Sequence, residues 1–125
     1  MSTTTTETRS LGPGGRQLSA VGVGTWALGG PFTFDSRDAG WGEVDDAESI
    51  RALHTAIDAG VTLIDTAPTY GTGHSERVIG QALAALPATV QESVTVATKF
   101  GLRIDESRRT GGGTDVHPEA IRAEC

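Results

Sequence analysis

Apolar runs separated by segments with helical spacing constrain the fold of this chain most strongly. The clearest run extends from Val61 to Asp65 without alternation of polar and apolar residues, and β-type runs also cover Leu18–Gly24 and Val94–Phe100. An unalternated run is typical of a strand that is covered on both faces of a parallel sheet. Strands that alternate with amphipathic helices connect through right-handed crossovers. The sequence therefore predicts an α/β fold with a parallel sheet.

A first amphipathic helix is expected between the first two runs. It begins after Asp45, which acts as an N-cap and forms a capping arrangement with Glu48 three residues on. Gly60 supplies the C-terminal stop. One face of this helix carries residues at i, i+3, i+4 and i+7, namely Ile50, Leu53, His54 and Ile57.

A second helix is expected after the Val61–Asp65 run, with His74 or Ser75 as its cap and Pro87 as its end. A third helix begins with Pro118 at its first position, where proline is favoured. The inward face of the second helix is predicted to comprise Val78, Ala82, Leu83 and Leu86.

Four segments are expected to lie outside this alternation. Residues 1–8 are polar and predict a disordered tail. Residues 9–20 contain Gly-Pro-Gly-Gly and predict a small hairpin. Residues 29–42 form a long loop of the kind that is often functional, and residues 103–116 are expected to form a mobile loop.

Composition excludes several classes of partner. The chain of 125 residues and 12.9 kDa fits one domain or part of a larger one, and its net charge of −6 offers no broad basic surface for nucleic acid. The single cysteine, Cys125, cannot form an internal disulfide, which favours a reducing compartment. No apolar run approaches the roughly 20 residues that span a bilayer. We therefore expect a cytoplasmic protein without membrane or nucleic-acid partners.

Residues 22–27 match the G-x-G-x-x-G/A fingerprint of dinucleotide-binding folds, with acidic residues about 20 positions further on. That fingerprint requires a helix to begin inside the motif. Here Gly29-Gly30-Pro31 stops such a helix almost at once, so this reading is disfavoured.

A (β/α)8 barrel accommodates the pattern better. In that fold the active site is built from residues at the C-terminal ends of the strands. Thr25-Trp26, Asp65 with Tyr70, and Lys99 all occupy such positions in successive β/α units. The chain is expected to form the N-terminal part of this barrel, a bottom hairpin followed by about three β/α units.

A tyrosine, a lysine and an aspartate at one barrel mouth favour proton transfer. Tyrosine ordinarily titrates at about 10, and a nearby ammonium stabilises its anion. An aspartate can hold the lysine in place. Such a group suits protonation of a carbonyl oxygen as hydride arrives at carbon.

Other chemistries find less support in the sequence. His54, His74 and His117 are spread over helix and loop positions, so we expect no metal site. No nucleophile elbow is present for a hydrolase. His74 is expected to cap or pack the second helix.

Structural roles remain open for each residue of the predicted group. Asp65 could bond loop amides, Tyr70 could be a half-buried packing residue, and Lys99 could be a solvated residue at a strand end. Trp26 could pack at the barrel mouth or form a flat wall for a ligand. Their joint occurrence at barrel-mouth positions favours the catalytic interpretation.

Four segments resemble the aldo-keto reductase family, and most closely its bacterial general reductases, which are related to potassium-channel β subunits. The pattern D-T-A-x-x-Y-G-x-G-x-S-E is the most specific part of this resemblance. The segments are LSAVGVGTWALGG (18–30), DAGVTLIDTAPTYGTGHSERVIGQAL (58–83), VTVATKFG (94–101) and HPEAIRAEC (117–125).

The resemblance implies NADPH-dependent reduction of aldehydes or ketones on a (β/α)8 barrel whose bottom is closed by an N-terminal hairpin. By motif, Asp65, Tyr70 and Lys99 occupy three of the four catalytic positions of the family, with Tyr70 as general acid. Gly24, Thr25 and Trp26 match the first loop, which borders the nicotinamide and the substrate, and Asp65 is also assigned to cofactor binding. The resemblance thus implies Asp65, Tyr70 and Lys99 as catalytic residues, and Gly24, Thr25, Trp26 and Asp65 as cofactor-binding residues.

The family's fourth catalytic residue, a histidine at the end of the fourth strand, has no counterpart in these 125 residues. A whole barrel takes about 250 residues. Residues 9–125 are therefore expected to be the N-terminal portion of a reductase, interrupted within the third helix and inactive by itself. The alternatives are a nicotinamide-binding regulatory subunit, as the channel relationship suggests, and a non-functional remnant. The substrate and the oligomeric state stay open.

Overall fold

Three parallel strands form the centre of the molecule. The computed structural model describes residues 6–125, and in this part the strands β3 (Val23–Gly24), β6 (Leu63–Asp65) and β7 (Thr95–Ala97) lie in the order β3–β6–β7. Gly24 pairs with Asp65, and Asp65 pairs with Ala97, so the strands end level with one another. The predicted parallel α/β sheet is confirmed, as three strands of a barrel that is not closed within the described residues.

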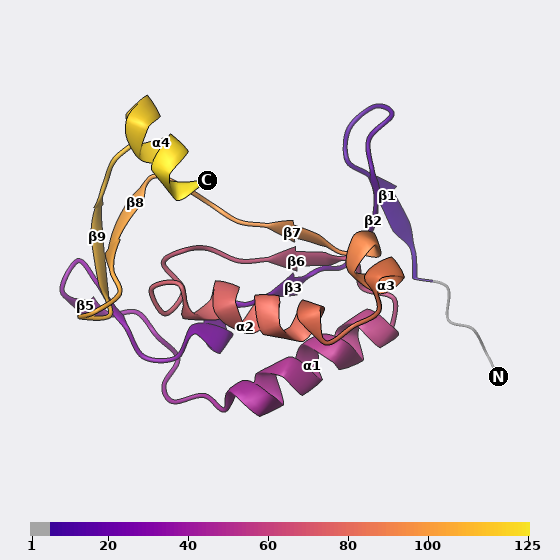
Figure 1. The fold of residues 1–125 in the computed structure, drawn as a ribbon, viewed down its shortest axis with the longest axis horizontal. Coiled ribbons are helices and arrows are strands. Elements are labelled where there is room, and N and C mark those ends of the chain that lie inside the picture. Colours follow the sequence, from indigo (N-terminus) through magenta and orange to yellow (C-terminus); the bar gives the residue numbers. More distant parts are fainter. Residues whose placement is uncertain (1–5) are drawn as a thin grey trace.

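Two helices cover this sheet along one side (Figure 1). They are α1 (Asp46–Asp58) and α2 (His74–Ala84). The predicted cap of α1 is confirmed, because the side chain of Asp45 accepts a hydrogen bond from the backbone N–H of Glu48 at 3.1 Å. The buried core between helices and sheet comprises Leu53, Ile64, Val78, Ile79, Ala82 and Val94.

The N-terminal hairpin is confirmed and lies at the end where the parallel strands begin (Figure 1). Its strands are β1 (Thr8–Ser10) and β2 (Gln17–Ser19), which pair antiparallel. Most of the tail expected at residues 1–8 lies outside the described residues, whereas Thr8 already belongs to β1.

The expectation of one continuous strand over 18–24 is wrong. The chain leaves β2 at Ser19, whose hydroxyl donates to the carbonyl of Val21 at 2.7 Å, and it enters β3 only at Val23. The backbone N–H of Ser19 donates to the side chain of Thr62 at 2.8 Å. The bond from Ser19 to Val21 is of the local kind that competes with strand pairing, whereas the bonds between Ser19 and Thr62 tie the end of the hairpin to the start of β6.

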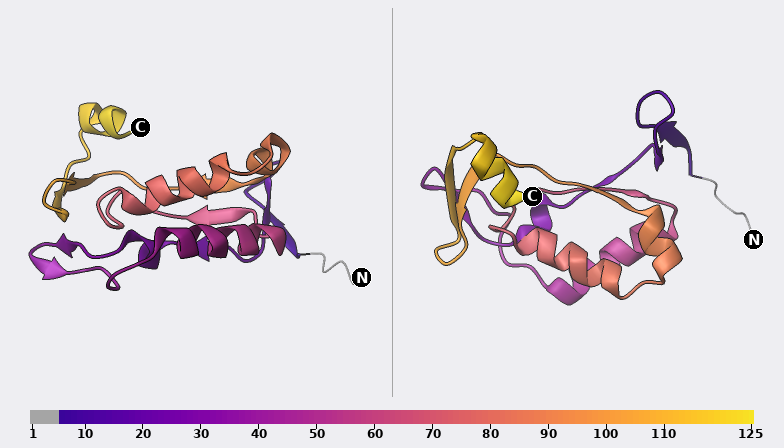
Figure 2. Two further views of the ribbon diagram at one scale, coloured as in Figure 1. Left: turned by 60° about the horizontal axis from the view of Figure 1, so that its bottom comes forward. Right: turned by 45° about the horizontal axis from the view of Figure 1, so that its top comes forward.

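A second sheet occupies the opposite end of the molecule, where the parallel strands finish (Figures 1 and 2). Both segments that were expected to be loops, 29–42 and 103–116, contribute strands to it, so those two predictions are wrong. In the order β5–β4–β9–β8 its strands are Arg37–Asp38, Thr33–Phe34, Thr110–Thr114 and Leu102–Asp105.

Tight turns and a close approach make this second sheet possible. Asp35 and Ser36 adopt positive φ angles of 48° and 63° in the turn between β4 and β5. Gly111 pairs with Phe34, and a Cβ atom at Gly111 would lie only 2.9 Å from the Phe34 ring. The glycine run at 111–113, which by its composition predicts a loop, therefore permits strand pairing instead.

Three short helices complete the described chain. The 3-10 helix η1 (Trp26–Gly29) follows β3 and stops at Gly30, and α3 (Ala88–Ser93) follows Pro87. The predicted helix α4 (Pro118–Glu124) begins with Pro118 at its first position. No helix in residues 6–125 is long and apolar enough to cross a membrane.

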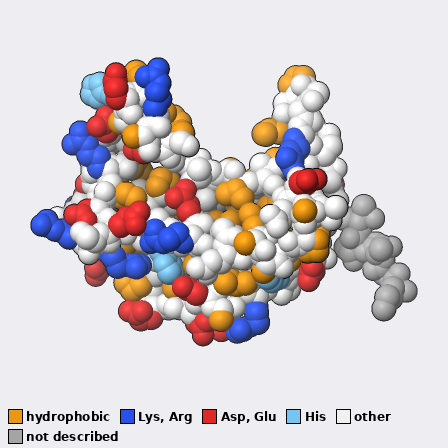
Figure 3. Space-filling model, in the orientation of Figure 1, with side chains coloured by type: hydrophobic (Ala, Val, Ile, Leu, Met, Phe, Trp, Pro, Cys, Tyr) orange, Lys and Arg blue, Asp and Glu red, His pale blue; other side chains and the backbone are white. Residues whose placement is uncertain are grey.

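Apolar side chains gather on the face between the hairpin and α4 (Figure 3). This face includes part of β7, where Val96 is 40% exposed, and the residues that follow it, where Phe100 is 54% exposed. The sheet is thus open to solvent on this side of the described structure.

Candidate active site

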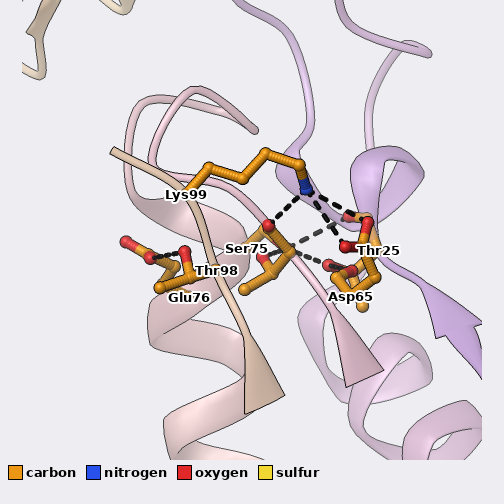
Figure 4. Close-up of polar contacts among 7 residues, drawn as sticks. Thr25, Asp65, Ser75, Glu76, Thr98 and Lys99 are labelled. Carbon is orange, nitrogen blue, oxygen red and sulfur yellow. Dashed lines mark hydrogen bonds and ion pairs between the residues drawn. The ribbon is translucent and has the colours of Figure 1, made fainter. Parts of the chain in front are cut away.

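The level ends of β6 and β7 bring Asp65 and Lys99 together. Asp65 is the last residue of β6, and Lys99 follows two residues after β7. The Lys99 Nζ atom donates to both carboxylate oxygens of Asp65, at 3.1 and 3.2 Å, and to the carbonyl of Thr66 at 2.7 Å. Figure 4 shows the lysine side chain reaching across the strand ends toward Asp65. All three hydrogen-bond donors of the ammonium therefore have an acceptor.

Tyr70 lies against this ion pair. It belongs to the loop between β6 and α2 and is half-buried, and its ring centroid lies 5.2 Å from Lys99 Nζ. This distance permits attraction between the ammonium and the ring. The structure thus brings together all three residues that were predicted to be catalytic.

The pKa of Lys99 is raised above its ordinary value of 10.5. Partial burial, the largest single effect, lowers this pKa, but the hydrogen bond to Asp65, the interactions with Tyr70 and the charge of the Asp65 carboxylate together raise it by more. Lys99 is consequently a fixed cation at neutral pH and is unsuited to act as a proton donor there.

Trp26 stacks on Tyr70. The two ring centroids are 5.7 Å apart and the ring planes differ by 3°, while the Trp41 ring meets Trp26 edge-on at 6.2 Å. The indole Nε1 donates to the carbonyl of Ala39 at 2.8 Å, which fixes the orientation of the ring. The flat wall that was one of two interpretations of Trp26 is therefore present beside Tyr70.

A cavity of about 320 Å³ brings three of the four predicted cofactor-binding residues together with Tyr70, and Asp65 is not part of its lining. Its lining comprises Gly24, Thr25, Trp26, Ala27, Trp41 and Tyr70. A Cβ atom at Gly24 would meet nothing within 4 Å, so the backbone there faces open space. Thr25, in contrast, is fully buried and its hydroxyl donates to the carbonyl of Asp65 at 2.9 Å. Its side chain is committed to the protein and is not free for a ligand.

A second cavity, of about 400 Å³, also borders Trp26 and Tyr70. It is lined mainly by apolar groups from η1, from the loop before α2 and from the second sheet, with one carboxylate from β5. The residues concerned are Trp26, Phe32, Phe34, Asp38, Ala39, Thr69, Tyr70 and Leu102. Sequence reasoning missed Phe34 and Leu102, because their strands β4 and β8 come together in one sheet only through β9, which pairs with both.

Ser75 has a role that differs from the one predicted from the sequence. The N-cap of α2 is Gly73, with a φ of 95° and no capping side chain, so the expectation that His74 or Ser75 caps this helix is wrong. Ser75 is fully buried, and its hydroxyl turns toward Thr25 and Thr66. Its place in the first turn of a helix gave the same signal as a cap.

The histidines stay outside the cluster. His74 Nε2 lies 2.7 Å from the carboxylate of Asp46 and joins the start of α2 to α1, in keeping with the predicted packing role. His54 and His117 contact Ala82 and Asp115. Residues 6–125 contain no group of three or more side chains arranged to hold a metal ion.

Comparison with known sequences places these features in one family. The profile of the Aldo/keto reductase family matches residues 20–125. The Aldo-keto reductase YhdN of Bacillus subtilis is 40% identical over 96 residues, which cover 77% of this chain and 26% of that protein. The NADH-specific methylglyoxal reductase of Escherichia coli is 42% identical over 85 residues, which cover 68% of this chain and 23% of that protein. The chain thus spans about a quarter of the length of these relatives.

Solved structures of similar proteins also superpose on this chain. The glycerol dehydrogenase AKR11B4 from Gluconobacter oxydans superposes with a TM-score of 0.67 at 39% identity, over 99% of this chain and 34% of that chain. The aldo-keto reductase AKR11C1 from Bacillus halodurans superposes with a TM-score of 0.74 over 95% of this chain and 34% of that chain. Its 22% identity supports a shared fold alone.

Proposed function

The chain belongs to the aldo/keto reductase family, and from this premise we propose that it supplies the general acid of a nicotinamide-dependent oxidoreductase that reduces aldehydes or ketones to alcohols. One observation carries the proposal. Tyr70, Lys99 and Asp65 meet at the C-terminal ends of adjacent parallel strands, where this barrel fold places its active sites.

Each residue of the group has a distinct role in the proposal. The Tyr70 hydroxyl donates its proton to the carbonyl oxygen of the substrate. The fixed charge of Lys99, 5.2 Å from the ring centroid, stabilises the phenolate that remains. Asp65 holds the lysine through both of its carboxylate oxygens. Trp26 keeps the tyrosine ring in one plane.

The cavity beside Gly24 and Trp26 fits a nicotinamide ring. It offers open space over a glycine backbone, a flat indole wall and direct access to Tyr70. When bound, a reduced nicotinamide supplies the hydride in this chemistry. We propose NADPH as the cofactor and regard NADH as the alternative, since the E. coli relative is named as NADH-specific.

The second cavity supports a carbonyl substrate with an apolar part. Phe34 and Leu102 face it from the second sheet, and Trp26 and Tyr70 close it on the side of the proton donor. An aldehyde that places its apolar group among these side chains brings its carbonyl toward Tyr70. Small molecules of this kind are the partners that we propose.

A cofactor oxidation assay tests the proposal. The protein, produced from its complete coding sequence, is mixed with NADPH or NADH and with benzaldehyde or methylglyoxal, and the absorbance of the reduced nicotinamide is followed. We expect oxidation that depends on the carbonyl compound, with NADPH preferred to NADH. Absence of carbonyl-dependent oxidation with either nucleotide would refute the reductase assignment.

A further inference from the structure

Three buried hydroxyl groups join the elements that carry the site. Thr25 follows β3, Thr66 follows β6 and Ser75 lies in the first turn of α2, and each of them is at most 1% exposed. The Ser75 Oγ atom lies 2.9 Å from Thr25 Oγ1 and 3.1 Å from Thr66 Oγ1. Figure 4 shows Ser75 between the strand ends, below the ion pair of Lys99 with Asp65.

Counting the hydroxyl hydrogens shows which group donates in each hydrogen bond of this cluster. Each hydroxyl has one hydrogen to donate. Thr25 donates its hydrogen to the carbonyl of Asp65 at 2.9 Å, because a carbonyl can only accept. Ser75 then donates to Thr25, whose hydroxyl oxygen lies 2.9 Å and whose backbone carbonyl oxygen lies 3.1 Å from Ser75 Oγ, and Thr66 is left to donate to Ser75. The chain of bonds runs from Thr66 through Ser75 and Thr25 to Asp65, and every hydrogen has an acceptor.

The same residues hold the catalytic group through the backbone. The carbonyl of Thr66 accepts from Lys99 Nζ at 2.7 Å, and the backbone N–H of Ser75 donates to the carbonyl of Tyr70 at 3.2 Å. Thr25 directly precedes Trp26, which stacks on Tyr70. The residues of the hydroxyl chain therefore also hold Tyr70 and Lys99 in place through backbone hydrogen bonds, and they adjoin Trp26 in the sequence.

We propose that Ser75 is a positioning residue, whose buried hydroxyl locks the start of α2 to the ends of β3 and β6 and so fixes Tyr70 relative to Lys99 and Trp26. Removal of this hydroxyl leaves the Thr66 hydrogen without an acceptor in a buried site, which favours movement of the strand ends. The effect on catalysis rests on the proposed reductase function, whereas the effect on the stacked rings does not.

Matched variants separate positioning from general stability. Ser75→Ala and Thr66→Val break the chain of hydrogen bonds, and Thr66→Ser keeps a hydroxyl at the same place. Thr95→Val is the control, because the Thr95 hydroxyl is buried in β7 with no hydrogen-bond partner in the described structure. All four are made in the protein from its complete coding sequence.

Near-ultraviolet circular dichroism gives the first readout, since the stacked Trp26 and Tyr70 contribute to it without any turnover. We expect Ser75→Ala and Thr66→Val each to differ from wild type in this spectrum, since both lose the bond that joins α2 to the end of β6. That difference should shrink when both proteins also carry Tyr70→Phe, and Thr66→Ser and Thr95→Val should stay close to wild type. Unchanged spectra in Ser75→Ala and Thr66→Val would overturn the proposal.

Steady-state kinetics give the second readout. We expect kcat to fall by about ten-fold to a hundred-fold in Ser75→Ala and Thr66→Val, as for a small displacement of a catalytic group. The KM for the nicotinamide should change by no more than about two-fold, which separates loss of positioning from loss of binding. Thr66→Ser should recover most of the lost kcat, and equal losses in Thr66→Val and Thr66→Ser would contradict the proposal.

A misfolded variant and a wrong reductase assignment can each be told apart from a wrong positioning proposal. If Ser75→Ala does not fold, as judged by its far-ultraviolet spectrum, the comparison of Thr66→Val with Thr66→Ser decides the question. If wild type reduces no carbonyl but the difference spectra appear as expected, the reductase assignment fails and the positioning role stands.

Discussion

Lys99 is the single lysine among the 125 residues, and its contacts point to orientation rather than stability. Its side chain is 45% exposed and that of Asp65 is 52% exposed. Ion pairs as exposed as this contribute about 1 kcal/mol or less to folding. The Thr66 carbonyl and the two carboxylate oxygens instead fix where the ammonium lies.

The raised pKa of Lys99 predicts a loss of stability at high pH. Because its pKa in the folded protein lies above the ordinary 10.5, the stabilising contribution of Lys99 is complete below 10.5 and is lost as pH rises through the folded pKa. We compare the free energy of unfolding of wild type with that of Lys99→Met by urea denaturation. The difference should stay constant from about pH 7 to about pH 10 and shrink above that range.

Arg77→Met is the control for this measurement. Arg77 also forms an ion pair, with Glu106 at 3.1 Å, but its guanidinium keeps its charge throughout the range. Its difference from wild type should not change with pH. A Lys99→Met difference that grows above pH 10.5, or one that vanishes well below it, would contradict the assignment.

At the level of residues, the sequence predicted the side chains that lie at strand ends and missed those that act through burial. Asp65, Tyr70 and Lys99 were predictable because the ends of parallel strands meet at one edge. Ser75 and Thr66 were not, since a hydroxyl near a helix start has the same local pattern whether it caps the helix or crosses to another strand. Only the packing of α2 on the sheet distinguishes the two roles.

Two glycines hold η1 against the loop that carries Tyr70. A Cβ atom at Gly29 would lie 2.5 Å from the backbone nitrogen of Gly71 and 2.5 Å from the carbonyl carbon of Tyr70. The two backbones are thus in direct contact, and this contact sets the spacing between Trp26 and Tyr70. No larger residue fits at Gly29 without movement of one of the two elements.

A matched pair of glycine substitutions tests this contact. Gly29→Ala should lower the free energy of unfolding by about 1–3 kcal/mol, because it overpacks the contact. Gly80→Ala should raise it by about 0.5–1 kcal/mol, since Gly80 is exposed within α2 and a Cβ atom there meets nothing within 4 Å. Urea denaturation measures both, and a Gly29→Ala variant as stable as wild type would show that the contact yields.

Elements with local signals were predictable, and elements that need distant partners were not. Helix α1 carries its own cap at Asp45 and an apolar stripe within thirteen residues. In the second sheet, Phe34 pairs with Gly111 across a long separation, and β4 and β5 have two residues each. Strands so short have no periodicity to detect, so their sheet was expected to be loop.

β3 and β7 are the edge strands of the three-stranded sheet, and neither has a further strand beside it in residues 6–125. Val96 lies in β7 and is 40% exposed. An open apolar strand edge is a template for pairing with another chain. Both the fold class and an unpaired sheet edge could be predicted from the sequence, because three strands do not close a barrel, whereas the exposure of Val96 comes from the structure.

This edge predicts self-association when residues 1–125 are produced alone. Val96→Lys should reduce the association, because a charged side chain at a strand edge opposes pairing. Leu11→Lys is the control, since Leu11 is 64% exposed in the turn of the hairpin and away from the sheet. Sedimentation velocity measures both, and equal association of wild type and Val96→Lys would argue against the β7 edge as the contact.

The most direct test of the reductase assignment is the Tyr70→Phe variant of the protein from its complete coding sequence. This substitution removes the hydroxyl group that would donate the proton, and it keeps the aromatic ring that stacks on Trp26. Carbonyl reduction should fall by a factor of about a hundred or more, while the dissociation constant for the nicotinamide, followed by tryptophan fluorescence, should stay close to that of wild type. Full activity of Tyr70→Phe would contradict the central claim that Tyr70 is the general acid.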